Sequence, residues 1–204
     1  MKIVFIGPPG AGKGTQCQFL AAQFGIPHVG TGEMLRQLQG APAPMVHSQI
    51  NRGHFAPDDF VLEMIGARLA EPDCEPGYLL DGFPRTLVQA EAFDRMLEAQ
   101  SHRLDHVIHL QVEPDELVRR LAQRQVTGER SDDSAEFIRE RFVIYADRTR
   151  PLLDYYDRQA LVRPVDGMGG PKEVFENLLR AIRTGEAHLG SSLSTSLPPS
   201  LPDA

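Results

Sequence analysis

The chain has 204 residues, enough for one substantial hydrophobic core or for one core carrying small inserted subdomains. It is 41% hydrophobic, and no apolar stretch approaches the roughly 18 residues that span a bilayer, so we expect a soluble globular protein with no membrane partner. The net charge of −7 has the wrong sign for a general attraction to nucleic acid, so we expect no nucleic-acid partner either.

The hydrophobic pattern alternates between runs typical of strands and stretches with helical periodicity. Strand-like runs cover residues 2–6, 78–80, 106–112 and 161–165. Helical periodicity covers residues 14–24, 57–70, 86–100, 114–124, 135–159 and 171–183. This alternation predicts an α/β fold, with a parallel sheet and helices on both of its faces.

Three segments do not follow this pattern. Residues 31–58 contain two prolines before Gly53, and residues 125–134 are polar, so we expect both to be insertions at the sheet edge that handle substrate. Residues 185–204 are rich in serine and proline and are predicted to be a disordered tail. Leucines recur there every four residues, which hints at an apolar helical face, but Pro198 and Pro199 interrupt that pattern.

Cys17 and Cys74 are the only cysteines, and they lie too far apart in the sequence for a CxxC pair or a four-cysteine zinc site. We therefore expect a reducing compartment and a cytoplasmic protein.

The segment Gly7–Thr15, which reads GPPGAGKGT, follows the first predicted strand and precedes a helix. Glycines let backbone N–H groups converge on phosphate oxygens, the helix N-terminus adds positive potential, and Lys13 supplies a mobile cation. By composition alone this pattern arises in on the order of one chain in 10⁵ of this length. A dinucleotide fingerprint fits badly, because Thr15 stands where its third glycine belongs. We therefore assign nucleoside triphosphate binding to Gly10, Ala11, Gly12, Lys13, Gly14 and Thr15.

The position after the lysine is Gly14, where most phosphate loops carry a serine or threonine that binds Mg²⁺. We therefore predict no direct protein ligand for the metal, and place Mg²⁺ on waters held by Asp81. Glu33 is a second candidate for this support. It could equally stabilise the N-terminus of a helix as a first-turn carboxylate.

Four motifs occur in one order along the chain: GxPGxGKGT, TGEMLR at residues 31–36, DGFPRT at residues 81–86, and Gln89. Together they resemble the nucleoside monophosphate kinases, and among these most closely the adenylate kinases, over residues 1–183. The resemblance implies a single kinase domain at residues 1–184 with a five-stranded parallel P-loop sheet. It also implies a monophosphate-binding insertion at about 30–59, a short lid at about 125–134, and a monomer.

The same resemblance implies an AMP site. Its residues would be Thr31, Arg36, His54, Phe55, Ala56, Gly82, Phe83, Pro84, Arg85, Gln89, Arg130 and Arg141. The arginines at 36 and 85 suit bidentate contacts to a phosphate, and the Gln89 amide can both donate to and accept from an adenine edge. Arg85 as a solvated turn residue and Gln89 as an exposed helix position are the alternatives.

Arg120 and Arg124 are four residues apart and share one helix face, where like charges repel unless an anion lies near them. By the resemblance, both would lie near ATP, Arg130 and Arg141 would hold the transferring group, and backbone at Gly169 would lie near the ATP adenine. Arg119 and Arg139 are interpreted as solvated, salt-bridged residues. The predicted catalytic residues are Lys13, Asp81, Arg85, Arg124, Arg130 and Arg141.

The reaction implied is MgATP + AMP ⇌ 2 ADP, with ATP and Mg²⁺ as cofactors and positioning and electrostatic stabilisation as the main sources of catalysis. A kinase for UMP, CMP or another nucleoside monophosphate is the nearest alternative. A GTPase-like switch is a more distant one, because the chain has no NKxD motif and DxxG occurs only at Asp166–Gly169.

Overall fold

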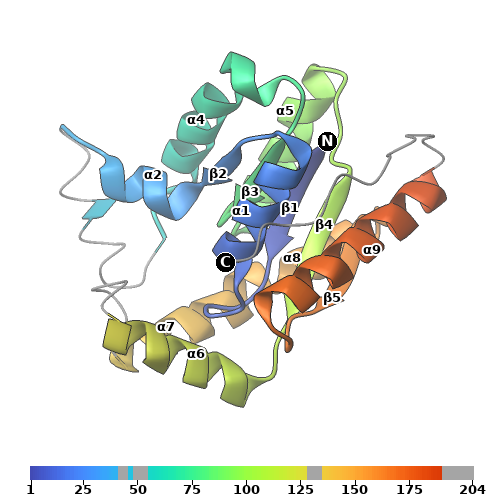
Figure 1. Cartoon of the computed structure of the whole chain (residues 1–204). Coiled ribbons are helices and arrows are strands. Elements are labelled where there is room, and N and C mark those ends of the chain that lie inside the picture. Colours follow the sequence, from blue (N-terminus) through green and yellow to red (C-terminus); the bar gives the residue numbers. More distant parts are fainter. Residues whose placement is uncertain (41–45, 48–54, 128–134, 190–204) are drawn as a thin grey trace.

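The computed structural model of the chain describes residues 1–40, 46–47, 55–127 and 135–189 (Figure 1). Its centre is a five-stranded sheet in which every pair of neighbouring strands is parallel, in the order β2-β3-β1-β4-β5. The strands are β1 (Lys2–Ile6), β2 (His28–Gly30), β3 (Tyr78–Asp81), β4 (His106–Gln111) and β5 (Val162–Asp166). The predicted α/β class and the five-stranded parallel sheet are therefore confirmed.

Helices follow each strand. They are α1 (Lys13–Phe24), α2 (Thr31–Gln37), α4 (Asp58–Leu69), α5 (Leu87–Ala99), α6 (Pro114–Thr127), α7 (Ala135–Ile144), α8 (Pro151–Asp157) and α9 (Pro171–Leu189), with a 3₁₀ turn η1 (Pro72–Cys74) and a π-helical turn η2 (Tyr145–Thr149). Within the described ranges, no helix is long and apolar enough to cross a lipid bilayer.

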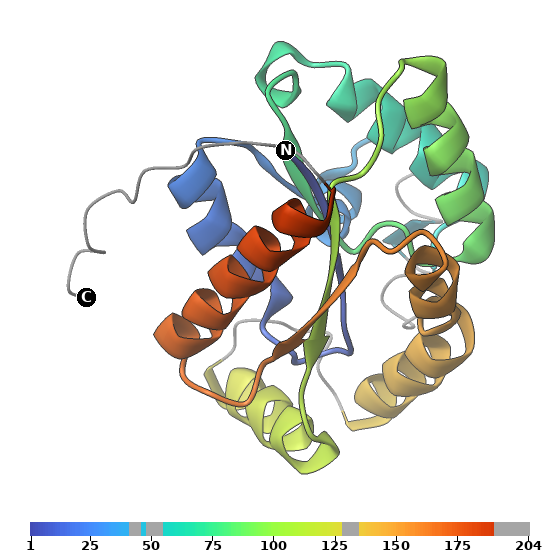
Figure 2. The same cartoon turned by 90° about the vertical axis from the view of Figure 1, so that its right-hand side faces the viewer.

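Successive side chains of a strand point to opposite faces of the sheet, so the core consists of two layers. On β1, Ile3 and Phe5 face the layer formed with α1 and α9, whereas Val4 and Ile6 face the layer formed with α4, α5 and α8. Figure 2 shows these two groups of helices on opposite sides of the sheet. Because both faces are covered, the central strands β1 and β3 read as nearly continuous apolar runs, as is usual for parallel sheets. The carboxyl ends of β1 and β3 lie next to each other because these two strands pair directly, with Phe5 opposite Asp81.

Several boundaries differ from the predictions. The strand β2 has only three residues, too few for a periodicity to show, and α2 follows it inside the predicted insertion. The single helix predicted over 135–159 is divided into α7, η2 and α8, and α8 begins at Pro151, whose ring suits a first helical position.

Two helices continue into segments predicted to be irregular. The lid was expected from residue 125, but α6 continues to Thr127. The tail was expected from residue 185, but α9 continues to Leu189. Gly185 is buried because the Arg163 side chain packs against its bare backbone, so this glycine favours helix packing and does not end the helix. Residues 128–134 and 190–204, which make up the rest of the predicted lid and tail, lie outside the described residues.

His106 on β4 gives the fold a predictable pH dependence. It is 1% exposed, and its Nδ1 finds no hydrogen-bond partner among the described residues. Burial, with the charge of Arg163 as a second cause, lowers the pKa of His106 to about 4. Since the folded chain resists protonation, the unfolded chain takes up this proton first as the pH falls below about 6.5.

We expect the free energy of unfolding to drop by up to about 3 kcal/mol between pH 6.5 and pH 4 through this group. Urea unfolding of the wild type and of His106→Asn at several pH values measures the effect, which should be missing from the variant. His102→Asn, at an exposed position, is the control and should keep the wild-type slope. Equal slopes in all three proteins would contradict the assignment.

Candidate functional site

A cavity of about 650 Å³ opens at the carboxyl ends of β1 and β3, between α2 on one side and α6 and α7 on the other. Most of the predicted site residues line it. They are Gly10, Gly12, Lys13, Gly14, Thr15, Thr31, Glu33, Arg36, Phe55, Ala56, Asp81, Gly82, Pro84, Arg85, Gln89, Arg120, Arg124 and Arg141. The structure therefore brings together residues that lie more than 100 positions apart in the sequence.

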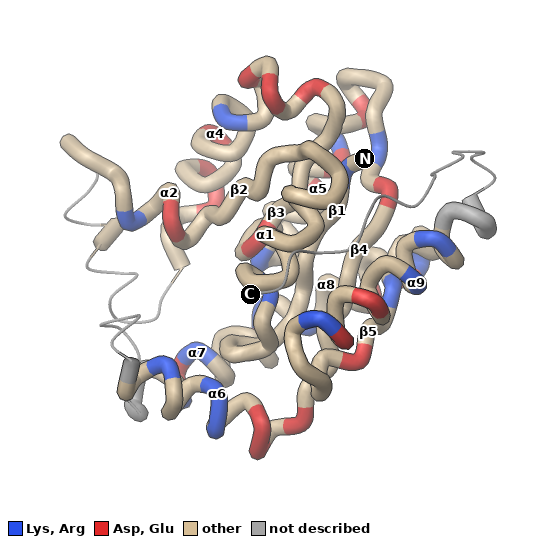
Figure 3. The backbone as a smooth tube through the Cα atoms, in the orientation of Figure 1, with Lys and Arg blue, Asp and Glu red and all other residues tan. Residues whose placement is uncertain are grey.

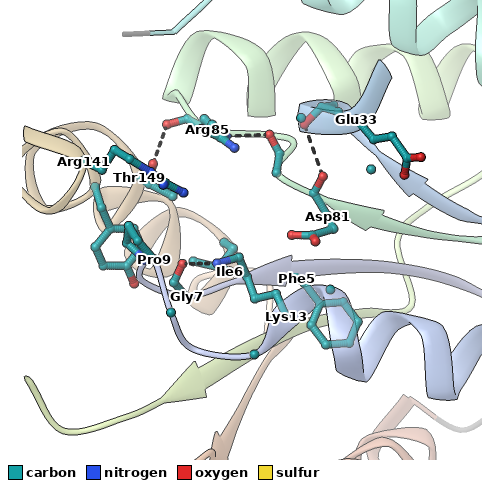
Figure 4. A pocket seen from close by; sticks show the side chains of 18 of the residues that line it. Phe5, Ile6, Gly7, Pro9, Lys13, Glu33, Asp81, Arg85, Arg141 and Thr149 are labelled. Atoms are coloured by element: carbon teal, nitrogen blue, oxygen red, sulfur yellow. Dashed lines mark hydrogen bonds between the residues drawn. The ribbon is translucent and has the colours of Figure 1, made fainter. Parts of the chain in front are cut away.

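The phosphate loop connects β1 to the N-terminus of α1, where the helix contributes positive potential. Gly10 has φ of 84°, and a Cβ there would lie 2.9 Å from Cγ of Leu121, so α6 packs directly onto the loop. The Lys13 Nζ donates to the Gly7 and Pro8 carbonyls at 2.8 and 3.0 Å, as Figure 4 shows for Gly7. The ammonium thus stays inside the curve of the loop.

Lys13 lies among other charges. Burial lowers its pKa to about 8, Asp81 acts in the opposite direction, and the charges of Arg85 and Arg141 lower it further. These two arginines come from the β3–α5 connection and from α7. Phosphate oxygens bound at this point would relieve the repulsion among three cations, so the cavity favours a polyanion.

Asp81 ends β3 and faces the loop across the cavity. A Cβ on Gly14 would lie 3.6 Å from its Oδ2, so the carboxylate stands beside the position at which other loops carry a hydroxyl. Burial would raise the pKa of Asp81, but His28, Lys13 and Arg85 together hold it below its usual value. An ionised carboxylate here fits a hydrated divalent cation.

Glu33 fits the metal less well. It lies in the first turn of α2, its Oε1 accepts from Gln37 Nε2 at 3.1 Å, and its carboxylate is turned away from that of Asp81 (Figure 4). These contacts match the alternative interpretation of Glu33 as a first-turn carboxylate that stabilises the helix N-terminus.

The other end of the cavity is built around the DGFPRT segment. Arg85 Nε donates to the Gly82 carbonyl at 2.8 Å, and its guanidinium carbon lies 5.1 Å from the centre of the Phe55 ring. Gly82 has φ of 83°, and a Cβ there would lie 2.6 Å from Thr31 Oγ1, which itself donates to the Asp81 carbonyl. Arg85 is thus held in the cavity wall and is not a solvated turn residue.

Gln89 is 2% exposed, so it is not an exposed helix position. Its Oε1 accepts from the Arg85 backbone N–H at 2.8 Å, and its Nε2 donates to Asp58 Oδ1 at 2.7 Å. Asp58 Oδ1 also accepts from Thr86 Oγ1 at 3.1 Å. Since an amide has two donors and two acceptor sites, one of each stays available on Gln89. Asp58 therefore fixes which way the amide faces.

Comparison with known sequences agrees with this arrangement. A family model described as adenylate kinase matches residues 5–161. The adenylate kinase of Rhodopirellula baltica is 62% identical over 166 residues, which are 81% of this chain and 86% of that protein. The chain belongs to the adenylate kinase family. Two less similar relatives are also adenylate kinases. That of Thermobifida fusca is 41% identical over 90% of this chain and 99% of that protein. That of Thermus thermophilus is 42% identical over 88% of this chain and 96% of that protein.

Some residues predicted for this adenylate kinase site do not line the cavity. Ala11 and Phe83 are 2% and 0% exposed and belong to the two core layers. Gly169 lies in the β5–α9 connection, outside the lining residues. His54 and Arg130 lie outside the described residues.

Two arginines of α6, Arg119 and Arg120, pair with a carboxylate of the same helix. Arg120 Nε donates to Glu116 Oε1 at 2.7 Å, and Arg119 contacts the same carboxylate. Hydrogen bonds from Arg119 and then Arg120 lower the pKa of Glu116 to about 2. Arg120 also donates to the Gly167 carbonyl at 2.8 Å. Glu116 is thus an anion of the chain itself that lies beside Arg120, and Arg119 is salt-bridged as predicted.

Arg124 and Arg141 line the cavity from α6 and α7, and Figure 3 shows the basic residues of these helices below the ends of the strands.

Thr149 in η2 is a residue that sequence reasoning missed. Its Oγ1 donates to the Arg85 carbonyl at 3.1 Å, so η2 is tied to the DGFPRT segment. A lone threonine in a long helical pattern carries no sequence signal for this contact.

Asp58 is a further residue that sequence reasoning missed, and its contact with Gln89 yields a test. Asp58→Ala removes the acceptor that orients Gln89, so we expect the KM for AMP to rise roughly tenfold with a much smaller change in the KM for ATP. Asp59→Ala is a matched control, because Asp59 is exposed in the same first turn of α4. Equal effects of the two variants on AMP would contradict the positioning role.

Proposed function

We propose that this chain catalyses MgATP + AMP ⇌ 2 ADP and so balances adenine nucleotides. The reaction follows from membership of the adenylate kinase family. The observation that supports the residue roles is that one cavity contains both the phosphate loop and the Arg85–Gln89 wall. A donor triphosphate on the loop and an acceptor at this wall would share one cavity, as direct transfer requires.

In the proposed mechanism, the loop N–H groups and Lys13 hold the β- and γ-phosphates of ATP. Arg85 and Arg36 bind the AMP phosphate, and the free donor and acceptor of Gln89 face its base. Since the acceptor is already an anion, little acid–base chemistry is needed. Catalysis then comes from alignment and from cations that stabilise charge on the moving phosphoryl oxygens.

Arg124 and Arg141 are proposed to supply that stabilisation from α6 and α7, with Arg130 as a further candidate from the lid segment. Asp81 would hold Mg²⁺ through waters, which agrees with its lowered pKa and its place beside Gly14. When bound there, the metal would supply positive charge that offsets the negative charge of the phosphates. The α6 and α7 helices would also shield the transfer from water, which otherwise competes as acceptor.

The test is ADP formation from MgATP with AMP, UMP, CMP or GMP in separate reactions. We expect AMP to be preferred by at least about tenfold, because buried hydrogen-bonding groups reject bases that leave them unpaired. The control without acceptor reports ATP hydrolysis. No ADP formation with any acceptor would overturn the kinase proposal, and a preference for UMP or CMP would overturn the adenine assignment.

We also propose that the protein acts as a monomer in the cytoplasm. One chain supplies both walls of the cavity, and both cysteines are free and buried, which suits a reducing compartment. Light scattering during gel filtration, at the concentration used for the assay, tests the monomer. A dimer mass would contradict it.

A further inference from the structure

Three potential metal ligands from three elements meet beside the phosphate loop. Cys17 comes from α1, His28 from β2 and Asp81 from β3, and one ligand atom of each lies within 4.8 Å of the other two. His28 and Asp81 line the cavity, whereas Cys17 is fully buried behind them. In the proposed phosphoryl transfer Asp81 holds the waters of Mg²⁺ and His28 only helps to keep that carboxylate ionised, so the Cys17 thiol has no role there and the imidazole no direct contact with the nucleotide.

The spacing of these atoms is close to that of a metal site. In a tetrahedral site with bonds of 2.0–2.3 Å, neighbouring ligand atoms lie about 3.3–3.8 Å apart. His28 Nε2 and Asp81 Oδ2 are already 3.7 Å apart, which is too far for a hydrogen bond. The remaining ligand atoms, which lie within 4.8 Å of one another, need to close by up to about 1.5 Å, which rotation about side-chain bonds can supply.

Two further observations favour an ion at this point. His28 Nε2 is a buried atom that finds no hydrogen-bond partner among the described residues, which is costly for a ring nitrogen. The backbone of two glycines also comes close to the ligands without crowding them, since a Cβ on Gly30 would lie 3.6 Å from His28 Nε2 and one on Gly14 would lie 3.6 Å from Asp81 Oδ2, both ordinary van der Waals distances. The side facing the cavity stays open for a water or a phosphate oxygen.

The mixture of ligand types selects the metal. Thiolate and imidazole prefer Zn²⁺ or Co²⁺, whereas Mg²⁺ takes oxygen ligands at octahedral geometry. Three protein ligands with one open position are typical of reactive zinc sites. We propose that Cys17, His28 and Asp81 form a second metal site, which binds Zn²⁺ directly and is distinct from the water-mediated Mg²⁺ position.

Binding would release the Cys17 thiol proton to solvent and would bond Asp81 to the zinc ion. A further consequence rests on the function proposed above. An Asp81 bound to Zn²⁺ can no longer hold the waters of Mg²⁺, so zinc would inhibit phosphoryl transfer while the nucleotide sites stay intact. The site would make the enzyme sensitive to free zinc.

The binding test uses Co²⁺ as a spectroscopic probe and the full chain without nucleotide. We expect a thiolate-to-cobalt charge-transfer band that saturates at one equivalent of metal. Cys17→Ala should abolish the band, His28→Gln should weaken cobalt binding at least about 100-fold, and Cys74→Ala should leave it unchanged. Cys74 is the matched control because it is the other buried free thiol. Thermal unfolding confirms that each variant is folded.

Absence of the band in the wild type, or its persistence in Cys17→Ala, would overturn the proposal. His28 and Asp81 would then form an electrostatic pair and no metal site. If Cys17→Ala does not fold, His28→Gln decides between these outcomes. In the assay, Zn²⁺ at one equivalent should inhibit the wild type and Cys74→Ala but not Cys17→Ala, in constant excess Mg²⁺. If the proposed function is wrong and the metal site is real, neither the wild type nor any variant forms ADP, but the wild type still shows the cobalt band.

Discussion

Lys13→Met is expected to lower turnover by about three orders of magnitude while the chain stays folded. Methionine has nearly the length of lysine but carries no charge, so the phosphate loop keeps its shape and loses its cation. The loss is largest in the transition state, where negative charge moves between donor and acceptor oxygens. Steady-state assays with AMP and MgATP measure it, and kcat should fall far more than either KM rises.

The matched control for this prediction is Lys172→Met, at an exposed position near the start of α9. It removes the same charge from the same protein and should leave kcat within about twofold of wild type. Thermal unfolding of both variants separates a catalytic effect from instability, because the Gly7 and Pro8 carbonyls lose their partner in Lys13→Met. A Lys13 variant with wild-type turnover would rule out the proposed role of the loop lysine.

Arg85→Ala is expected to act on the acceptor side. A bidentate, charge-assisted contact to phosphate is worth about 1.5–3 kcal/mol, so we expect the KM for AMP to rise roughly 10- to 100-fold. The KM for ATP should change little, since the loop that holds the donor is intact. The Gln89 contact should persist, because it uses the backbone N–H of residue 85.

Arg95→Ala provides the comparison for this substitution, because Arg95 lies exposed on α5, the helix that follows Arg85. It should change neither KM by more than about twofold. Unchanged AMP kinetics in Arg85→Ala would remove Arg85 from the acceptor site. An equal rise in both KM values would place it at the shared phosphoryl position instead.

Local sequence patterns predicted an element correctly where one physical requirement determines which residues occur in it. The strand runs at 2–6 and 78–80 and the loop between Gly7 and Thr15 were predicted because burial on both faces and phosphate binding each leave a distinct pattern. The β2 strand was missed because three residues at a sheet edge show no period. The extension of α9 was missed because Gly185 reads as a helix breaker until Arg163 is seen to pack against it.

Contacts between distant elements were the part that the sequence could not supply. The Glu116–Arg120 ion pair joins residues four apart on one helix, a spacing that is readable in the sequence but that competes there with the neighbouring like charges of Arg119 and Arg124. Asp58 reads as an ordinary first-turn carboxylate, and only the packing of α4 on α5 shows that it orients Gln89. The Cys17–His28–Asp81 cluster likewise depends on how α1 lies against the sheet.

The close approach of Gly10 to α6 links two positions that are far apart in the chain. Leu121 is 1% exposed and rests where a side chain at position 10 would stand. The size of the Leu121 side chain therefore sets the distance between the phosphate loop and α6, the helix that carries Arg120 and Arg124. Because residue 10 also has φ of 84°, a side chain there is disfavoured on two grounds, and we expect glycine at this position across relatives. Gly10 would thus be selected for two reasons. Its backbone adopts a positive φ, and its lack of a side chain sets the distance between the bound donor and the arginines of α6.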